Sequence, residues 1–241
     1  MKIYTVLVLT LFLKTYSADI LSCGSSLGYS IPTMCRISGG SVADGESLQI
    51  SNANANITTL SFSNTEFTSI PADTFVKFQN IKVFYVTNNN LKSFYGSSFQ
   101  NAKQLTQMSL FTNQITAIPN QAFSLCSSLN KLSIYNNPII DLSESPFAGL
   151  TQLQELSLED LPLESFDSSI FVHLPALEKL DITNCSLRVI DKDFLDSNLN
   201  ITEIKLYDND IVTIEDGAFS TLVSLNYLDV SYNLLTSLKT V

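Results

Sequence analysis

The 241-residue sequence has little basic charge, a single histidine and only four cysteines. Its 13 lysines and arginines stand against 23 aspartates and glutamates, which gives a formal net charge of −10. An acidic chain of this kind repels nucleic acid and anionic membrane surfaces. We therefore expect its partners to be proteins and not nucleic acid.

The sequence also offers almost no material for catalysis. Gly24 to Gly28 match the GxSxG pattern of hydrolase nucleophiles, but they lie between two cysteines and lack the flanking strand and helix of such a turn. The only imidazole, His173, falls in a later loop. Asp191, Asp193 and Asp196 lack the glycine and the closing glutamate of a calcium-binding hand. We predict neither an enzyme nor a protein with a cofactor or metal.

Long apolar runs are missing except at the N-terminus. The N-terminal segment has the pattern of a signal peptide: Lys2, then the apolar stretch 3–13, then small residues around 15–17. We predict a signal peptide over 1–17, cleaved after Ser17 or Ala18. A membrane anchor is the alternative, but about 11 apolar residues fall short of the roughly 20 that span a bilayer. Cleavage also removes Lys14 and leaves 11 basic against 23 acidic residues. We expect a secreted, extracellular product without membrane insertion.

What the sequence does have is a repeat of 24 residues, clearest at 201–222, ITEIKLYDNDIVTIEDGAFSTL. Eight units follow one another without insertion. Positions four and six are apolar in all eight units. Position nineteen is phenylalanine or leucine in the seven units that reach it. A single unit cannot bury these groups, whereas stacked units can. The units begin at Ile57, Ile81, Leu105, Leu129, Leu153, Leu177, Ile201 and Leu225.

Alternation of apolar and polar residues around positions four to six predicts a short strand in each unit, paired in parallel with the next. Position nine requires a small amide, because the turn after the strand leaves backbone groups to be satisfied. Thr65, Leu161 and Cys185 depart from this rule, and we expect a local backbone adjustment at Leu161. The predicted asparagine ladder consists of Asn89, Asn113, Asn137, Asn209 and Asn233.

The pattern LxxLxLxxNxLxx(I/L)xxxxFxxL resembles the typical 24-residue leucine-rich repeat of extracellular proteins. The resemblance implies an α/β repeat solenoid, a horseshoe with a parallel β-sheet on its concave face and an irregular or short helical convex side. It divides the chain into a signal peptide at 1–17, an N-terminal cap at 18–55 and eight repeats at 56–241. The last repeat is incomplete and has no C-terminal cap.

The four cysteines fall into two pairs of different character. Cys23 and Cys35 precede the first repeat, and we expect them to form one disulfide after secretion. Cys126 and Cys185 lie three units apart, on the order of 14 Å at the usual strand spacing, which is too far for a bridge. We expect both to be buried free thiols.

Three sequons predict glycosylation. Asn56 and Asn200 occupy the same surface position just before the leading apolar residue of a unit. Asn184 has a cysteine inside its sequon and stands at the end of a strand, which makes it the poorest acceptor of the three. A sequon is used only where it is accessible.

Partner binding is expected on the concave face, where outward side chains gather. Tyr85, Phe111 and Tyr135 come onto neighbouring strands, and exposed aromatics on a rigid sheet are typical of protein interfaces. A partner with an apolar knob and basic residues would suit this face. The alternative is that aromatic residues are present because they favour strands. Further candidates in later units are Glu155, Glu159, Asp181, Tyr207 and Tyr227.

The two-cysteine cap and the first unit ending in SIPADTF are similar to insect secreted immune leucine-rich repeat proteins and to Toll-type ectodomains. This resemblance implies innate immune recognition through binding of another protein. The alternative is a fragment of a cell-surface receptor or adhesion ectodomain acting in development. The chain stops within its eighth unit, so we expect either a piece of a longer protein or a homo- or hetero-dimer through the uncapped end.

Overall fold

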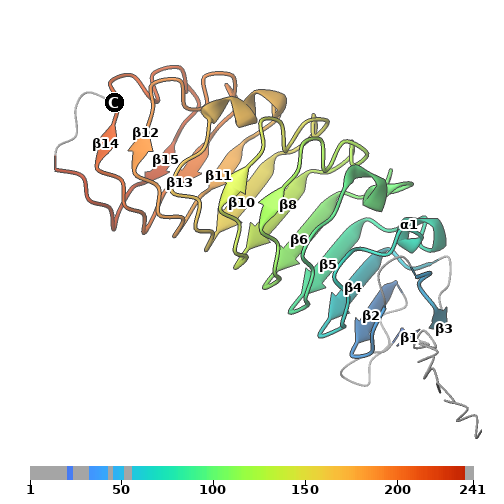
Figure 1. The fold of residues 1–241 in the computed structure, drawn as a ribbon. Helices are drawn as coiled ribbons and strands as arrows, with labels where there is room; N and C mark the ends of the chain where they lie inside the picture. The colour runs from blue at the N-terminus through green and yellow to red at the C-terminus, as the bar shows by residue number, and fades with distance from the viewer. Residues whose placement is uncertain (1–20, 24–32, 43–45, 52–55, 237–241) are drawn as a thin grey trace, which may run out of the picture.

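The computed structural model describes residues 21–23, 33–42, 46–51 and 56–236. Within them, nine parallel strands form one continuous sheet along an elongated stack of coils (Figure 1). Each repeat pairs with the next at a step of 24 residues, so that Leu132 is opposite Leu156 and Leu156 is opposite Leu180. The predicted leucine-rich repeat solenoid is confirmed. The strands are β2 (Met34–Ser38), β4 (Thr59–Ser63), β5 (Val83–Thr87), β6 (Gln107–Phe111), β8 (Lys131–Tyr135), β10 (Glu155–Glu159), β11 (Lys179–Asp181), β13 (Glu203–Lys205) and β15 (Tyr227–Asp229).

Alternation along the central strands separates the core from the concave surface. In β8, Leu132 and Ile134 are buried, while Lys131 is exposed and Ser133 and Tyr135 are half-buried. The same pattern recurs from β5 to β10, because successive side chains of a strand point to opposite faces.

Phenylalanine rings fill the space between the sheet and the convex side. Phe99 and Phe123 have ring centroids 5.8 Å apart, and Phe123 and Phe147 are 6.5 Å apart. In the sixth unit the ring comes from Phe194, which contacts Phe171 at 5.8 Å and Phe219 at 6.0 Å. The sequence places a leucine, Leu195, at this position of the repeat; it is also buried and has a φ of +62°. A one-residue shift of the backbone therefore keeps an aromatic ring between Phe171 and Phe219.

The convex side is made of short helical turns and two-residue strand pairs, as the resemblance implies. The helical turns are α1 (Thr74–Lys77), η1 (Gly96–Phe99) and η2 (Ser168–His173). The strand pairs join β7 (Ala117–Ile118) to β9 (Asp141–Leu142) and β12 (Val189–Ile190) to β14 (Thr213–Ile214). None of the helices within the described residues is long and apolar enough to cross a membrane.

Asparagines at position nine link successive turns. The Asn209 side-chain oxygen accepts hydrogen bonds from the backbone N–H groups of Cys185 at 2.9 Å and Leu187 at 3.1 Å, while its amide donates to the Ile182 carbonyl at 2.7 Å. Each bond crosses to the preceding unit. The same amide donation to the preceding unit is made by Asn89, Asn113, Asn137 and Asn233.

The ladder changes where Leu161 and Cys185 replace asparagine. The Cys185 thiol donates to the carbonyls of Leu158 at 3.0 Å and Thr183 at 3.3 Å, the positions that an asparagine amide uses elsewhere. After Leu161 the chain turns on itself: the Leu163 N–H donates to the Leu161 carbonyl at 2.8 Å, and Glu164 has a φ of +51°. The expected backbone adjustment is confirmed, and it falls between the two convex strand pairs.

The sheet begins inside the segment that the sequence assigns to the cap. β2 pairs in parallel with β4, so that Cys35 is opposite Leu60, a step of 25 residues instead of 24. β1 (Leu21–Ser22) and β3 (Ile50–Ser51) form a separate parallel pair beside it. A disulfide joins Cys23 to Cys35, with their Cα atoms 4.7 Å apart. The cap therefore continues the solenoid, because β2 contributes core side chains as a repeat strand does.

Candidate protein-binding face

Two aromatic rings stack on the concave surface. Phe111 ends β6 and Tyr135 ends β8, and the two residues are opposite one another in the parallel register. Their ring centroids are 4.1 Å apart, and their planes differ by 17°. Both side chains are half-buried. The pair is a rigid apolar feature of this surface, which is the character of an interface anchor.

Tyr85 lies on the next strand but at a different level. It is opposite Ser109, two residues before Phe111 along β6. Its hydroxyl accepts a long hydrogen bond from the Gln107 amide at 3.4 Å. The three aromatics predicted to share this surface do lie on neighbouring strands, but the ring contacts among the described residues join Phe111 to Tyr135 and leave Tyr85 beside them.

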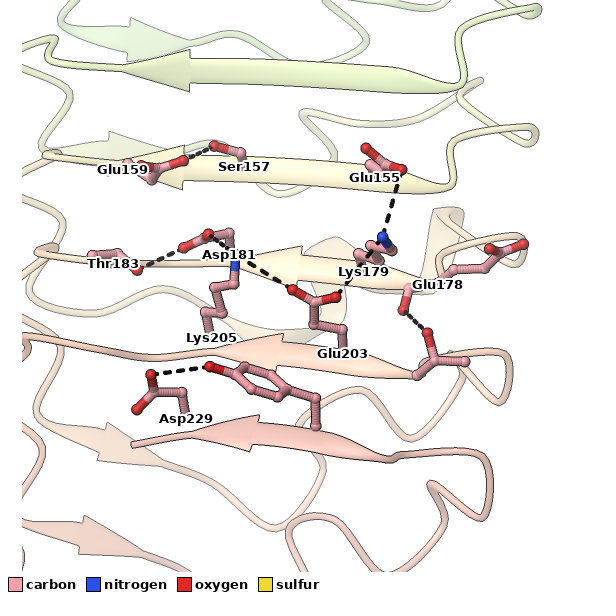
Figure 2. Close-up of polar contacts among 12 residues, drawn as sticks. Glu155, Ser157, Glu159, Glu178, Lys179, Asp181, Thr183, Glu203, Lys205 and Asp229 are labelled. Carbon is pink, nitrogen blue, oxygen red and sulfur yellow. Dashed lines mark hydrogen bonds and ion pairs between the residues drawn. The ribbon is translucent and has the colours of Figure 1, made fainter. Parts of the chain in front are cut away.

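Beyond the aromatic pair, the concave face carries a chain of alternating charges across four strands. It starts with Lys131 and Glu155 at 2.9 Å and ends with Lys205 and Asp181 at 3.3 Å. Between them, Lys179 lies 4.0 Å from Glu155 and 3.8 Å from Glu203, and Glu203 lies 3.3 Å from Lys205. We call these six residues the charge ladder; Figure 2 shows its part on β10, β11 and β13.

The charge ladder corrects the expected acidic surface. Glu155 and Asp181 were predicted to attract a basic partner, but lysines at equivalent positions of neighbouring strands already pair with them. Burial lowers the pKa of Lys205, yet attraction to Asp181 and hydrogen bonds to Glu203 and Asp181 outweigh this, so the pKa lies above its ordinary value. With three lysines and three acids, the charge ladder is neutral as a whole.

Glu159 stands outside the charge ladder. It is half-buried at the end of β10, opposite Tyr135, and forms no ion pair among the described residues. Its carboxylate accepts a hydrogen bond from the Ser157 hydroxyl (Figure 2). Burial, followed by the negative charge of Glu159, raises the pKa of Tyr135. Glu159 therefore lies opposite Tyr135 in the register, and no lysine or arginine pairs with its charge among the described residues.

The last candidates of this face lie near its C-terminal end. The Tyr207 ring contacts that of Tyr232, with centroids 5.0 Å apart. Tyr227 is exposed and its hydroxyl donates a long bond to Asp229 at 3.4 Å. The Ser231 hydroxyl and N–H also donate to Asp229, and these bonds lower the Asp229 pKa. Tyr207 and Tyr227 are thus not part of the Phe111–Tyr135 pair.

Acidic side chains also line a hollow of about 370 Å³ on the convex side. Asp191, Asp193 and Asp196 lie there with Asp167 and the buried Asn198. Among the described residues, no three acidic, cysteine or histidine side chains are arranged to hold a metal ion. Asn198 donates to the carbonyls of Phe171 at 3.0 Å and Leu174 at 2.7 Å. It tethers neighbouring turns at a place where the sequence pattern indicates only an apolar residue.

The free cysteines and the single histidine that the sequence singled out are not part of the outward surface of the concave sheet. Cys126 and Cys185 are free and buried, and burial raises the pKa of each thiol to about 12. His173 is half-buried at the end of η2. The GxSxG pattern at 24–28 lies outside the described residues.

All three sequon asparagines are exposed, and hydrogen bonds of the Asn184 and Asn200 amides can be named. The Asn184 amide donates to Asp160 at 2.7 Å, and the Asn200 amide donates to the Pro175 carbonyl at 3.0 Å. Asn56 is exposed at the start of the first repeat. A glycan at Asn184 would replace one of the two hydrogens of the amide that donates to Asp160.

Sequence reasoning missed two lysines of the charge ladder, Lys179 and Lys205, and it missed Asn198. Lys179 and Lys205 occupy the same outward positions as the acids that were singled out, so the strand register alone would have placed opposite charges side by side. Asn198 could have been found from the sequence, because the other units have an apolar residue, large or small, at its position of the repeat.

Comparison with solved structures identifies proteins of the same architecture. TLR13 in complex with ssRNA13 aligns with a TM-score of 0.71 at 24% identity, over 76% of this chain and 26% of that one. Toll of Drosophila, solved in complex with Spatzle, aligns with a TM-score of 0.65 at 19% identity, over 76% of this chain and 27% of the Toll chain. Internalin C2 of Listeria monocytogenes aligns with a TM-score of 0.59 at 23% identity, over 76% and 74%. At these identities the likeness shows the fold.

The chain spans about a quarter of the length of the two receptors. No curated protein matches its sequence. A family model described as a BspA type leucine rich repeat region, with 6 copies, matches residues 116–240, and a second described as leucine rich repeat matches residues 55–115. Together with the 24-residue register and the parallel sheet, these matches show that the chain belongs to the leucine-rich repeat family.

Proposed function

We propose that this chain is an extracellular binding protein that holds another protein on its concave face, as part of innate immune recognition. The observation that carries the proposal is the stacked Phe111–Tyr135 pair, 4.1 Å between centroids, on the outward side of the sheet. Such a pair presents apolar area without losing much side-chain freedom on binding, because its rings already fix one another. The scaffold itself serves binding and not catalysis.

The solved structures of the same fold give the proposal its context. The Toll structure contains Spatzle, and that complex is described as a molecular hub in Drosophila development and innate immunity. The TLR13 structure contains single-stranded RNA, so the fold serves nucleic acid ligands as well. For this chain the net charge of −10 favours a protein over a polyanion.

The alternative is that the chain forms part of a cell-surface receptor or adhesion ectodomain that acts in development. The Toll–Spatzle complex is linked to development as well as to immunity, and this chain covers 27% of the Toll chain in that structure. A longer transcript with a membrane-spanning segment would support this alternative. Induction of the transcript by infection would support the immune role.

Secretion, the disulfide and the glycans belong to the same proposal. Expression of the full sequence in eukaryotic cells should release a product that begins at Ala18 or Asp19 and carries glycans at Asn56 and Asn200. N-terminal sequencing and intact mass before and after glycosidase treatment would show this. Retention of residues 1–17 on the released product would contradict the signal peptide.

The binding face is tested with a library of extracellular proteins displayed on yeast and sorted against the folded chain. A partner recovered in this way is then measured against the double variant Phe111→Ser, Tyr135→Ser. We expect its affinity to fall at least about tenfold, the usual scale for loss of an aromatic anchor. Tyr95→Ser is the matched control, because Tyr95 is 61% exposed beside η1 on the convex side. Equal binding of the partner to the wild type, the double variant and Tyr95→Ser would contradict the proposal.

A further inference from the structure

We propose that Glu159 and the outward face of the Tyr135 ring form a subsite for one arginine side chain of the protein partner. The inference rests on the proposed function and names the chemistry that the partner brings to the same face. The acids of the charge ladder take no part in it.

The orientation of the aromatic pair leaves one ring face directed at Glu159. Phe111 and Tyr135 are opposite one another on adjacent strands, and their planes differ by only 17° at a centroid separation of 4.1 Å. This separation is close to the spacing of paired strands, about 4.8 Å, so the rings stack along the direction that runs from strand to strand. Phe111 covers one face of Tyr135. The other face is turned toward β10, where Glu159 is the residue opposite Tyr135.

Three acids lie around this point, and two of them, Glu159 and Asp160, form no ion pair among the described residues. Glu159, Asp160 and Asp181 all lie close enough to Cys185 to raise its pKa by their charges, after the larger effect of burial. Asp181 is neutralised by Lys205 at 3.3 Å, and Asp160 accepts from the Asn184 amide, which carries no charge. The lysines that face this region are Lys131, Lys179 and Lys205, and each is paired with an acid of the charge ladder. A cation supplied from outside would therefore be attracted here.

Arginine fits this arrangement better than other groups. Its planar guanidinium stacks on an aromatic ring and donates two parallel N–H groups to a carboxylate. A cation over a tyrosine face is attracted by the negative face of the ring, and the attraction is stronger where water is excluded. No three acidic, histidine or cysteine side chains in the described parts of the chain are arranged as a metal site, which leaves an organic cation as the matching ligand.

The charge ladder gives the subsite its selectivity. Glu155 lies on the same strand as Glu159 but holds Lys131 at 2.9 Å. A basic side chain approaching Glu155 would have to compete with that lysine and would be repelled by Lys179, whose ammonium lies 4.0 Å from the same carboxylate. Among the described residues of the sheet, Glu159 combines a ring face with a carboxylate that holds no cation. The partner's arginine is thereby placed at one position of the face.

The test uses Nα-acetyl-arginine-N-methylamide as the probe, titrated into the full chain with ¹³C-labelled tyrosine rings. Tyr135→Phe assigns the ring signal. We expect saturable shifts of the Tyr135 signal, at least about fivefold weaker binding in Glu159→Gln, and wild-type binding in Glu155→Gln, since a charge-assisted contact is lost only in the first variant. The matching citrulline compound, which has the same shape without the charge, should not saturate.

Equal binding of the probe to Glu159→Gln and Glu155→Gln, or equal shifts with the citrulline compound, would overturn the subsite. A readout that needs no probe supports the geometry: the pKa of Tyr135 should fall in Glu159→Gln and stay unchanged in Glu155→Gln. If a displayed partner depends on Phe111 and Tyr135 but binds Glu159→Gln as well as the wild type, the subsite is wrong and the proposed binding face stands. If the partner ignores all of these residues, the binding face is wrong, and the probe titration still decides the subsite.

Discussion

At the scale of single residues, the asparagine ladder decides how firmly neighbouring turns hold together. Asn209 is buried and bridges two N–H groups and a carbonyl of the preceding unit. Asn113 is equally buried and donates to the Val86 and Phe111 carbonyls, but its side-chain oxygen has no partner. The two residues therefore differ in how many backbone groups they satisfy.

This difference predicts unequal costs of truncation. Asn209→Ala should lower the free energy of unfolding by about 3 kcal/mol, since each buried group left without a partner costs about 1–3 kcal/mol. Asn113→Ala should cost at least about 1 kcal/mol less, because no N–H group loses an acceptor. Urea denaturation followed by circular dichroism measures both. A larger loss in Asn113→Ala would mean that the acceptor half of the ladder contributes nothing.

Cys185 replaces the donor half of an asparagine but only part of its acceptor half, through a backbone hydrogen bond from Leu161 to its sulfur. Its thiol reaches the carbonyls of Leu158 and Thr183, but sulfur is a weak acceptor for the N–H groups across the turn. Cys185→Asn should raise the free energy of unfolding by about 1 kcal/mol, the scale of one net hydrogen bond. Cys185→Ala, the control, should lower it. Destabilisation by the asparagine would show that the backbone after Leu161 has moved too far to use the amide.

At the scale of elements, Asp73 connects α1 to the cap. Its carboxylate accepts from the Leu48 N–H at 3.0 Å, and the Lys77 ammonium lies 3.0 Å away. Burial raises the pKa of Asp73, but hydrogen bonds from Ser47, Leu48 and Lys77 outweigh burial and hold it below the ordinary value of 3.8. A carboxyl with a lowered pKa stabilises the folded state above its unfolded pKa, and loses that contribution as pH falls through the lower, folded value.

The consequence is a cap that loosens in acid. The unfolding midpoint in urea should be higher for the wild type than for Asp73→Asn at pH 6, and the gap should narrow progressively as pH falls below about 4. Hydrogen exchange at β2 would locate the change in the cap. A gap that is the same at pH 6 and pH 3 would show that the carboxylate charge is not what holds this contact.

The charge ladder spans several strands, yet it should add little stability. Lys179 lies between Glu155 and Glu203, but its side chain is 49% exposed. Exposed pairs contribute about 0–1 kcal/mol, and both acids keep a second lysine. Lys179→Met should therefore change the free energy of unfolding by less than about 1 kcal/mol, and the change should shrink in high salt. A loss of several kcal/mol would show that the ladder holds the strands together.

At the scale of the whole molecule, the fold could be predicted because one rule repeats. Apolar residues at positions four and six fix the register of a parallel sheet, and eight repetitions leave no other arrangement that buries them all. The exceptions could not be predicted in the same way. Phe194 takes the ring position of the sixth unit because the next residue, Leu195, has a positive φ, which a side-chain pattern does not reveal.

The candidate site was only partly predictable for a related reason. The sequence placed Phe111 and Tyr135 on neighbouring strands, since both hold position seven of their units. It did not show that Glu155 is paired and Glu159 is not, because that depends on where three lysine side chains reach. Side-chain pairing across strands is set by rotamers and distances. A pattern of residue types does not determine rotamers or distances.

The proposed binding face places a protein partner on the concave sheet across β5, β6 and β8. Photo-cross-linking measures directly where the partner binds. The cross-linker p-benzoylphenylalanine replaces Ser109 in one protein and Tyr95, on the convex side, in another. Ser109 is an outward residue between Tyr85 and Ser133 in the register. Each protein is irradiated in complex with the partner recovered by display. We predict a covalent complex from position 109 and none from position 95. Cross-linking from position 95 alone would place the partner on the convex side and contradict the proposed binding face.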